Sequence, residues 1–349
     1  MNKKRISIIG SVGIPVKYGG FETLAEQLST GLSEKFVFTV FCTTLKYKAS
    51  EREKVWNNVN RKFIPINANG FASIIYDIVS MLIAVKNSEI LLILGGSAGF
   101  FLPFIKYFFP KKKIIFHPDG VEWKRKKWSK LTGLFLFNSI QKACAAADKI
   151  IIDNDELLSQ YNKYSNKTAL LQYGGDQFKL LHKKPNEPYW LTIARCEPEN
   201  NLEMIIDSFA ALKTEEWVLV TNYKNKFGKK LLQKIQGYSN IKIIREEYDI
   251  TKLSQLLSSC KGYIHGHSSG GTNPSLVSSL FLSVPVLCHN NRFNVATTRN
   301  KAYYFSSVGE LAYIIESEPK PNPELLEIAK TDFTWKKVCN DYLELLQNV

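Results

Sequence analysis

Residues 5–32 read RISIIGSVGIPVKYGGFETLAEQLSTGL. The apolar run at residues 5–9 predicts a buried strand, a glycine-rich turn follows, and residues 21–32 have the spacing of a helix with one apolar side. The same succession of a short apolar strand and a helix recurs along the chain. Near-continuous apolar strands that alternate with helices are typical of parallel sheets covered on both faces. The sequence therefore predicts an α/β protein.

The pattern predicts strands at residues 5–9, 36–42, 62–66, 90–94, 113–116, 149–152, 190–194, 217–221, 241–244, 262–265 and 284–288. It predicts helices at residues 21–32, 74–85, 134–147, 202–212, 253–259 and 275–281. A polar stretch with two prolines separates the strands into two sets. We therefore expect two doubly wound Rossmann-like domains that face each other across a cleft, with ligands beyond the carboxyl ends of the strands. The expected segments are a first domain at 1–180, a linker at 181–188, a second domain at 189–330 and a C-terminal helix at 331–349 that packs back on the first domain.

Composition limits the class of protein. The chain has 349 residues, 45% of them hydrophobic and 22% charged, which excludes a disordered protein. The six cysteines are scattered without a Cys-x-x-Cys pair, as expected for free thiols in a reducing compartment. The apolar part of the N-terminal stretch is too short for a signal peptide. These features predict a cytoplasmic protein.

The net charge of +14 is concentrated in the first half of the chain. Residues 1–180 have a net charge of +12 and residues 181–349 a net charge of +2. Residues 100–130 combine nine Lys or Arg and two acids with Phe, Tyr and Trp, a mixture suited to an anionic membrane surface. The alternative is a buried strand beside a solvated basic loop. Nucleic acid is the other anionic partner, but no nucleic-acid-binding signature is present.

Residues 90–110 have the length of a membrane-spanning helix. Three glycines, a proline and a lysine interrupt this stretch: Gly95, Gly96, Gly99, Pro103 and Lys106. A buried strand, a glycine turn and a short apolar helix fit these residues better than a span. We therefore expect the protein to lie on the inner face of the membrane as a peripheral protein.

Two loops in the first half follow predicted strands. The glycine-rich loop of residues 10–22 precedes a helix and can expose backbone N–H groups to an anion, although it has neither the G-x-G-x-x-G nor the P-loop spacing. Its Gly19–Gly20 pair would let a bulky ligand approach the backbone; the alternative is a tight structural turn. His117, Asp119 and Glu122 follow the strand at residues 113–116. A carboxylate there suits an acceptor hydroxyl, and the alternative is that Asp119 only serves an Asp-Gly turn.

Two loops in the second half suggest a diphosphate site. Arg195 follows the strand at 190–194, and the glycine-rich loop of residues 265–273 follows the strand at 262–265 and precedes a helix. A guanidinium and such a loop at one sheet edge can clamp a diphosphate. The pair His265 and His267 suggests a metal site, but no third ligand lies nearby in the sequence and neutral hydrogen-bonding histidines are favoured. The Asp153–Asp155 stretch likewise fits a helix cap better than a metal site.

These loops together resemble glycosyltransferase family 4, and within it the bacterial rhamnosyltransferase-like group. The resemblance is carried by four motifs in order along the chain: Gly13-Ile-Pro-x-Lys-Tyr-Gly-Gly-Phe-Glu-Thr23, Asp119-Gly-x-Glu-Trp-Lys-Arg-x-Lys-Trp128, Ala194-Arg-x-Glu-Pro-Glu-Asn-Asn201 and His265-Gly-His-Ser-x-Gly-Gly-Thr-Asn-Pro-Ser-Leu276. It implies the GT-B fold, transfer with retention of configuration, and no cofactor or essential metal. It also implies a nucleotide-sugar donor and an undecaprenyl-diphosphate-linked saccharide acceptor in the synthesis of capsule, O-antigen or exopolysaccharide.

The resemblance also implies roles for individual residues. The catalytic set is Asp119, His117 and Arg195. The donor-binding set is Gly19, Gly20, Arg195, Asn200, His267, Gly270, Gly271, Thr272, Asn273 and Ser278. The acceptor-binding set is Tyr18, Glu22, Glu122, Trp123, Lys124 and Arg125.

The chain departs from the family pattern at three positions. Asn200 stands where wider family 4 has a lysine, so Arg195 must do more of the clamping. Gly270 and Ser278 stand where that family has a Glu-x7-Glu pair, whose second carboxylate would bind ribose hydroxyls. A dTDP-sugar, such as dTDP-rhamnose, has one hydroxyl fewer to bind and is the donor we expect. A catalytically inactive homologue that binds glycans or acts as a scaffold is the alternative.

Overall fold

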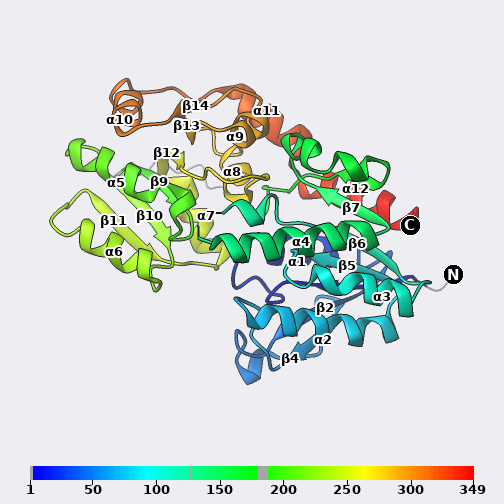
Figure 1. The fold of residues 1–349 in the computed structure, drawn as a ribbon. Helices are drawn as coiled ribbons and strands as arrows, with labels where there is room; N and C mark the ends of the chain where they lie inside the picture. Colours follow the sequence, from blue (N-terminus) through cyan, green and yellow to red (C-terminus); the bar gives the residue numbers. More distant parts are fainter. Residues whose placement is uncertain (1–2, 126, 180–187) are drawn as a thin grey trace. The chain divides into compact units, whose positions relative to one another are not determined.

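The computed structural model describes residues 3–125, 127–179 and 188–349 (Figure 1). These residues form two compact units. The first unit contains residues 3–124, 128–172 and 335–349, and the second contains residues 125, 127, 173–179 and 188–334. The predicted linker, residues 181–188, lies outside the described residues except for Pro188.

The first unit is built on an eight-stranded sheet. Its strands are β1 (Arg5–Ile9), β2 (Val37–Thr43), β3 (Val55–Trp56), β4 (Val59–Ile64), β5 (Ile90–Leu94), β6 (Lys113–His117), β7 (Lys149–Ile152) and β8 (Thr168–Leu170). Their order across the sheet is β3-β4-β2-β1-β5-β6-β7-β8, and all neighbours are parallel except β3 and β4. The central strands are buried along their length because helices cover both faces.

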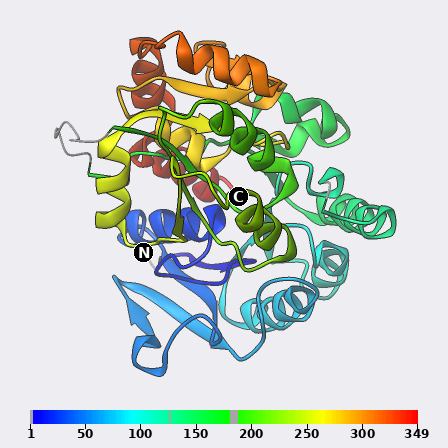
Figure 2. The ribbon, with the colours of Figure 1, turned by 90° about the vertical axis from the view of Figure 1, so that its left-hand side faces the viewer.

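Helices lie on both faces of this sheet. They are α1 (Gly20–Gly31), α2 (Ala72–Asn87), α3 (Leu102–Phe108), α4 (Lys130–Ala146) and α12 (Trp335–Gln347). The chain moves outward from β1 through α1 to β2, and then in the opposite direction through α2, α3 and α4. Right-handed crossovers therefore place α1 on one face and α2, α3 and α4 on the other. Figures 1 and 2 show this division, with α2, α3 and α4 together on one side of the sheet.

The last helix of the chain, α12, belongs to the first unit. It packs on α1, and a Cβ at Gly31 of α1 would lie 2.9 Å from Cys339 Sγ, so the two helices approach closely. Val338, Tyr342 and Leu346 are buried in this packing. The predicted C-terminal helix that packs back on the first domain is thus confirmed.

The second unit is built on a six-stranded parallel sheet. Its strands are β9 (Tyr189–Ile193), β10 (Trp217–Thr221), β11 (Ile241–Arg245), β12 (Cys260–His265), β13 (Val286–His289) and β14 (Tyr303–Phe305), in the order β11-β10-β9-β12-β13-β14. Its helices are α5 (Leu202–Ala211), α6 (Lys226–Lys234), α7 (Ile250–Ser259), α8 (Pro274–Ser279), α9 (Arg292–Thr297), α10 (Val308–Glu316) and α11 (Pro323–Asp332). Sheet and helices together bury a core that includes Trp217, Phe209 and Phe305.

All eleven predicted strands and six predicted helices are present, with ends displaced by up to four residues. The prediction for residues 90–110 is also confirmed, because β5 is followed by a 3₁₀ helix at Gly99–Phe101 and by the short helix α3. No helix in the described parts of the chain is long and apolar enough to cross a membrane.

Candidate functional site

The loops that follow β9 and β12 are bonded to each other. β9 and β12 are neighbours in the sheet, so their carboxyl ends lie side by side. The Asn201 side chain donates to the Gly266 carbonyl at 2.8 Å, and the Ser268 N–H donates to the Glu199 carbonyl at 2.8 Å. The Arg195 loop and the glycine-rich loop of residues 265–273 therefore form one connected edge of the second unit, as the sequence predicts.

Asn200 holds this edge in shape. Its side-chain amide donates to the Arg195 carbonyl at 2.7 Å, and its Oδ1 lies 2.7 Å from His267 Nδ1. Both side chains are buried. Because an amide oxygen only accepts, Nδ1 of His267 carries the proton in this contact. Asn200 and His267, both predicted donor-binding residues, thus fix the backbone from which the Arg195 side chain emerges.

The Arg195 side chain lies in a charged cluster. Its Nη2 is 3.6 Å from Glu197 Oε2, and Lys127 Nζ is 3.5 Å from Glu197 Oε1. Burial acts to raise the pKa of Glu197, but the charges of Arg195, Lys127 and Arg125 and a hydrogen bond with Glu199 together hold that pKa below its usual value. Burial raises the pKa of the neighbouring Glu199, and the Glu197 charge adds to this effect. The guanidinium of Arg195, which stays charged in proteins, therefore lies half-exposed beside a carboxyl pair.

Sequence reasoning missed Glu197, Glu199 and Lys127 as members of this cluster. The available signal was the Arg-x-Glu-Pro-Glu pattern at the end of a predicted strand, where two carboxyls accompany a cation. No signal in the pattern predicted the contact with Lys127, because about 70 residues separate it from Glu197.

The glycine-rich loop ends at a capped helix. Gly271 has φ +99°, a left-handed conformation that favours glycine. Asn273 caps α8 by accepting the Ser275 N–H at 3.0 Å, and Pro274 occupies the first turn as predicted. Thr272 is buried in the same loop, directly after the Gly270–Gly271 pair in the sequence. These residues give the loop a fixed shape at the end of β12.

Ser278, at the position where the resemblance implies a glutamate, is buried on α8. Its Oγ accepts a hydrogen bond from Gln177 Nε2 at 3.3 Å. Gly175 lies directly against this helix, because a Cβ there would be 2.8 Å from the Val277 side chain and 2.9 Å from the Ser278 nitrogen. The Gln177 amide therefore contacts the position where the resemblance implies a carboxylate.

In the first unit, the loop between β1 and α1 is held by two glutamates of α1. Glu22 Oε1 accepts the Val12 N–H at 2.7 Å, and Glu26 Oε2 accepts the Val16 N–H at 2.8 Å. The two glutamates are one helical turn apart and face the same loop. Glu22, expected from the resemblance to bind acceptor, thus also bonds to the loop backbone.

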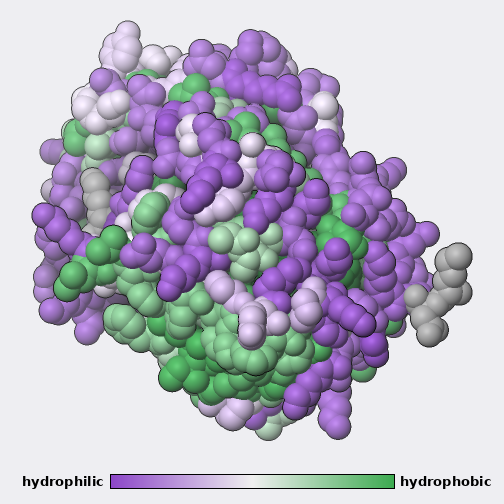
Figure 3. All heavy atoms as spheres, turned by 45° about the vertical axis from the view of Figure 1, so that its right-hand side comes forward, coloured by the Kyte–Doolittle hydropathy of each residue, from purple (hydrophilic) through white to green (hydrophobic). Residues whose placement is uncertain are grey.

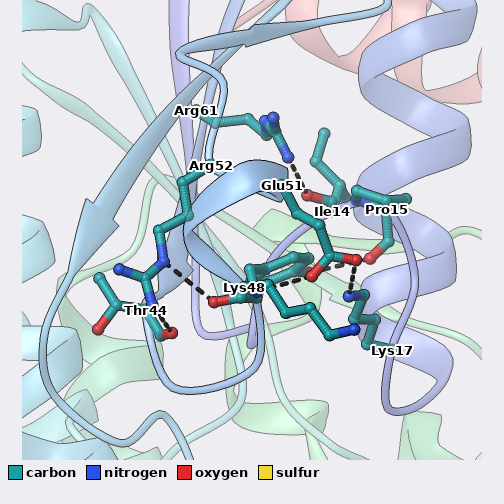
Figure 4. Close-up of polar contacts among 9 residues, drawn as sticks. Ile14, Pro15, Lys17, Thr44, Lys48, Glu51, Arg52 and Arg61 are labelled. Carbon is teal, nitrogen blue, oxygen red and sulfur yellow. Dashed lines mark hydrogen bonds and ion pairs between the residues drawn. The ribbon is translucent and has the colours of Figure 1, made fainter.

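Basic and aromatic side chains fix the middle of this loop (Figure 4). Arg61 donates to the Ile14 carbonyl at 3.2 Å, and the Tyr47 hydroxyl donates to the Pro15 carbonyl at 2.9 Å. Lys17 Nζ lies 2.6 Å from Glu51 Oε1. The loop is therefore a rigid structure before α1.

The glycines that the loop conformation requires are Gly10 and Gly13, with φ +98° and +119°. A Cβ at either would overlap a neighbour: Leu94 O at 1.8 Å for Gly10 and Cys42 Sγ at 2.5 Å for Gly13. Gly19 is extended, with φ −164°, so its conformation does not require glycine. The structural-turn interpretation thus accounts for Gly10 and Gly13 and leaves the binding prediction for Gly19 and Gly20 open. Tyr18, just before them, stacks under Lys46 Nζ at 5.4 Å.

His117 ends β6 and is buried, and burial lowers its pKa to about 4. Its Nδ1 lies 3.0 Å from the Pro118 carbonyl, so Nδ1 carries the proton of the neutral ring. The ring of Phe21, at the start of α1, meets it edge-on at 5.3 Å. Asp119 is half-buried, and Gly120 has φ +57°, so the Asp-Gly pair does form a turn. A neutral histidine and a carboxyl therefore stand together at the end of β6.

The remaining predicted acceptor residues are divided between the two units. Glu122 Oε1 accepts the Trp128 indole N–H at 3.0 Å, and the Trp123 ring meets Phe137 of α4 at 5.6 Å. Lys124 is exposed in the first unit, whereas Arg125 is buried in the second unit and contributes to the field around Glu197.

The two candidate metal sites of the sequence were the pair His265 and His267 and the Asp153–Asp155 stretch. His265 is buried, and burial lowers its pKa to about 3, so it is neutral at pH 7. Asn154 caps the 3₁₀ helix Asp155–Gln160 by accepting the Glu156 N–H at 3.1 Å, which confirms the predicted cap. Within residues 3–125, 127–179 and 188–349, no three or more His, Cys, Asp or Glu side chains are grouped to hold a metal ion.

Comparison with solved structures establishes the class of fold. Sucrose-phosphate synthase from Thermosynechococcus elongatus is similar over 99% of both chains, with a TM-score of 0.79 and 11% identity. HepE from Anabaena, in complex with UDP and glucose, is similar over 100% of both chains, with a TM-score of 0.75 and 13% identity. The catalytic domain of starch synthase IV from Arabidopsis thaliana, bound to ADP and acarbose, is similar over 99% of both chains, with a TM-score of 0.70 and 11% identity. The chain thus has the GT-B fold, as predicted.

Comparison by sequence covers a smaller part of the chain. Residues 3–176 match a family model described as "Domain of unknown function (DUF1972)". No curated protein matches the sequence. The rhamnosyltransferase-like grouping within family 4 stays a prediction.

Proposed function

We propose that the chain is a retaining glycosyltransferase that moves a sugar from a nucleotide-sugar donor to a lipid-linked saccharide. The observation that carries this proposal is the connected edge of the second unit, where the Arg195 loop and the loop of residues 265–273 are hydrogen bonded to each other. A charged guanidinium beside a glycine-rich loop suits a diphosphate. The GT-B fold supports the proposal, since solved structures with this fold carry UDP or ADP.

In this proposal Arg195 stabilises negative charge on the departing diphosphate. Preorganised positive charge aimed at a leaving group is commonly a large catalytic term. Asn200 and His267 act as positioning residues, because they hold the backbone of the Arg195 loop. Asp119, with the neutral His117 beside it, orients or deprotonates the acceptor hydroxyl.

The proposed donor is dTDP-L-rhamnose, and the proposed acceptor is a saccharide on undecaprenyl diphosphate at the inner face of the bacterial membrane. Ser278 supports a deoxyribose nucleotide, because it stands in place of a ribose-binding carboxylate and its Oγ already accepts from Gln177. The role would lie in the synthesis of capsule, O-antigen or exopolysaccharide. Calorimetric titration with dTDP-, UDP- and GDP-sugars tests the donor, and tighter binding of a UDP-sugar would reject dTDP.

The central test is Arg195→Ala. We expect transfer to membrane-extracted acceptor to fall by about a hundredfold or more, by analogy with the loss of one oxyanion donor. Arg195→Lys should recover only part of the rate, because a lysine keeps the charge but not the planar fork. Arg245→Ala, an exposed arginine on the edge strand of the same sheet, is the control and should keep full activity.

Unchanged activity in Arg195→Ala would remove Arg195 from the proposed chemistry. Absence of transfer by the native protein with any donor, together with retained glycan binding, would instead indicate the inactive homologue. Product linkage measured by NMR tests retention of configuration.

A further inference from the structure

The helix layer of α2, α3 and α4 has an unusual outer side. The inner side of α2 buries Tyr76, Ser80 and Met81 toward the sheet. A surface helix of this kind normally carries polar residues on its outer side. Here the outward positions carry large hydrophobic side chains. We call these the apolar face: Phe71, Ile75, Leu82, Phe104, Tyr107, Phe108, Leu131, Leu134, Phe135 and Phe137.

The apolar face is concentrated rather than scattered. It holds ten of the twenty large hydrophobic residues that are exposed in the described parts of the chain, and all five exposed phenylalanines among them. Tyr107 is 79% exposed and Leu131 is 80% exposed, so neither is part of the core. Figure 3 shows a broad area of hydrophobic residues on this side of the molecule. Gathered hydrophobic surface of this kind marks an interaction site, whereas single exposed residues do not.

Aromatic contacts join the helices into one surface. On α3, Phe104 stacks on Phe101 at 4.9 Å and meets Phe108 at 4.4 Å. Phe100, just before α3, meets Phe135 of α4 at 5.8 Å. The helices α2 and α3 are also in contact. The apolar face is therefore continuous from α3 to α4 and borders α2.

The exposed charges on the three helices have one sign. The three helices contain a single carboxyl, Asp77, and it is buried. Their exposed ionisable side chains are lysines, Lys86, Lys130 and Lys142, and the exposed Lys111 lies in the turn between α3 and β6. Beyond α2, the exposed Glu89 is paired with Arg5. A surface that combines aromatic and leucine side chains with lysines, and exposes no acid on its helices, matches the boundary between acyl chains and anionic headgroups.

We propose that the apolar face docks on an anionic lipid bilayer. The Phe, Tyr and Leu side chains enter the headgroup boundary, and the flanking lysines contact lipid phosphates. The proposed function places the protein at a membrane, and the apolar face is the surface that docks there. The biological role of this surface rests on the proposed function. Vesicle binding itself requires neither donor nor transfer.

The test is flotation of the full chain with vesicles of phosphatidylcholine containing about 30 mol % phosphatidylglycerol. We expect the native protein to float with these vesicles, and to bind at least tenfold more weakly to pure phosphatidylcholine. The double variant Tyr107→Ser, Leu131→Ser should lose about tenfold or more in partition coefficient, because two exposed apolar side chains are removed. Both residues are so exposed that folding should be unaffected, which circular dichroism and thermal unfolding verify.

The matched control is Tyr313→Ser, Leu45→Ser, which removes the same two residue types at 73% and 64% exposed positions outside the apolar face. This variant should bind vesicles like the native protein. Equal losses in both variants, or no binding by the native protein, would overturn the proposal. So would a dimer in sedimentation that Tyr107→Ser, Leu131→Ser dissociates without any vesicle binding, because the occupant would then be a second copy. Nucleotide titration in solution tests the transferase proposal separately, so failure of one leaves the other standing.

Discussion

Asn200 shows how one buried side chain can hold the backbone of a charged neighbour. Its amide connects the Arg195 carbonyl to His267 inside the second unit. Both of its hydrogen bonds are made by a buried group, so their loss leaves partners without compensation from water. Asn200, which stands where the resemblance implies a lysine, therefore helps to set the shape of the loop.

We expect Asn200→Ala to lower the free energy of unfolding by about 1–3 kcal/mol, because the Arg195 carbonyl and the buried His267 imidazole each lose one hydrogen bond. Urea unfolding measures this change. Asn222→Ala is the control, since Asn222 is only half-buried and its Oδ1 accepts one N–H, from Lys224. Equal stabilities of the Asn200→Ala and Asn222→Ala variants would contradict the role assigned to Asn200.

The buried carboxyl of Asp77 should make the stability of the protein depend on pH. Burial raises its pKa to about 7, and the hydrogen bond from Ser97 Oγ at 2.9 Å offsets burial only in part. In the unfolded chain the pKa returns to about 3.9. Between these two values the folded state holds a proton that the unfolded state has released. The free energy of unfolding should therefore fall as pH rises from about 4 to about 7, and level off above that.

Asp77→Asn should remove this fall, because asparagine keeps an acceptor for Ser97 and carries no charge. Urea unfolding at about pH 5 and about pH 8 should show the variant gaining stability over the native protein at the higher pH. Asp155→Asn, an exposed position, should leave the profile unchanged. Parallel profiles for the native protein and Asp77→Asn would show that the native carboxyl is not held protonated.

The contacts between individual side chains were the hardest feature to predict from the sequence. The pattern placed Arg195 and the loop of residues 265–273 at one edge because strand ends in a parallel sheet share an edge. It could not show that Arg125 and Lys127 join the Glu197 cluster, since that contact depends on packing between distant segments. Local pattern also could not reveal that Glu22 and Glu26 bond to the loop before α1.

At the scale of elements, the contact between β1 and β5 depends on Gly10. The two strands are parallel neighbours, and the chain leaves β1 through Gly10 beside Leu94, the last residue of β5. With φ +98° and Leu94 O only 1.8 Å from an ideal Cβ, this position excludes any side chain. The first loop of the protein is therefore set by the spacing of the central strands.

We expect Gly10→Ala to abolish soluble folded protein, because the strain and the overlap with backbone both oppose the fold. Expression with size-exclusion chromatography measures this. Gly309→Ala is the control: its Cβ would meet nothing within 4 Å, and it lies inside α10 without a positive φ. That variant should gain about 0.5–1 kcal/mol of stability. Normal yield of Gly10→Ala would mean that the loop can move away from β5.

Element types were predicted well where apolar runs were long. The run at Ile90–Leu94 is fully buried and could only be a strand in this pattern. The sequence missed β3, β8 and β14, which have two or three residues each and no readable period. It also missed the helices α9 and α10, and it missed α6, whose four lysines obscure the few apolar positions that face the core. Short or strongly charged elements owe their conformation to neighbours rather than to their own pattern.

At the scale of the whole molecule, α12 links the end of the sequence to the first unit. Leu346 is fully buried there, and Lys4 Nζ donates to its carbonyl at 3.3 Å. Leu346→Ala should therefore lower the free energy of unfolding of the first unit by about 2–5 kcal/mol. Hydrogen exchange should show faster exchange in α1, while the strands β9–β14 keep their protection.

Glu344→Ala, at an exposed position of α12, is the control and should change exchange in neither unit. Loss of protection in β9–β14 rather than in α1 would contradict the assignment of α12 to the first unit.

The same packing sets an order of events during translation. Residues 335–347 leave the ribosome only after residues 173–334, so the helix α1 waits for its partner while the second unit is made. At typical rates of synthesis this interval is roughly ten to thirty seconds. During it, the side of α1 around Gln27 and Gly31 has no α12 against it. The nascent first unit therefore leaves that side of α1 uncovered until α12 emerges.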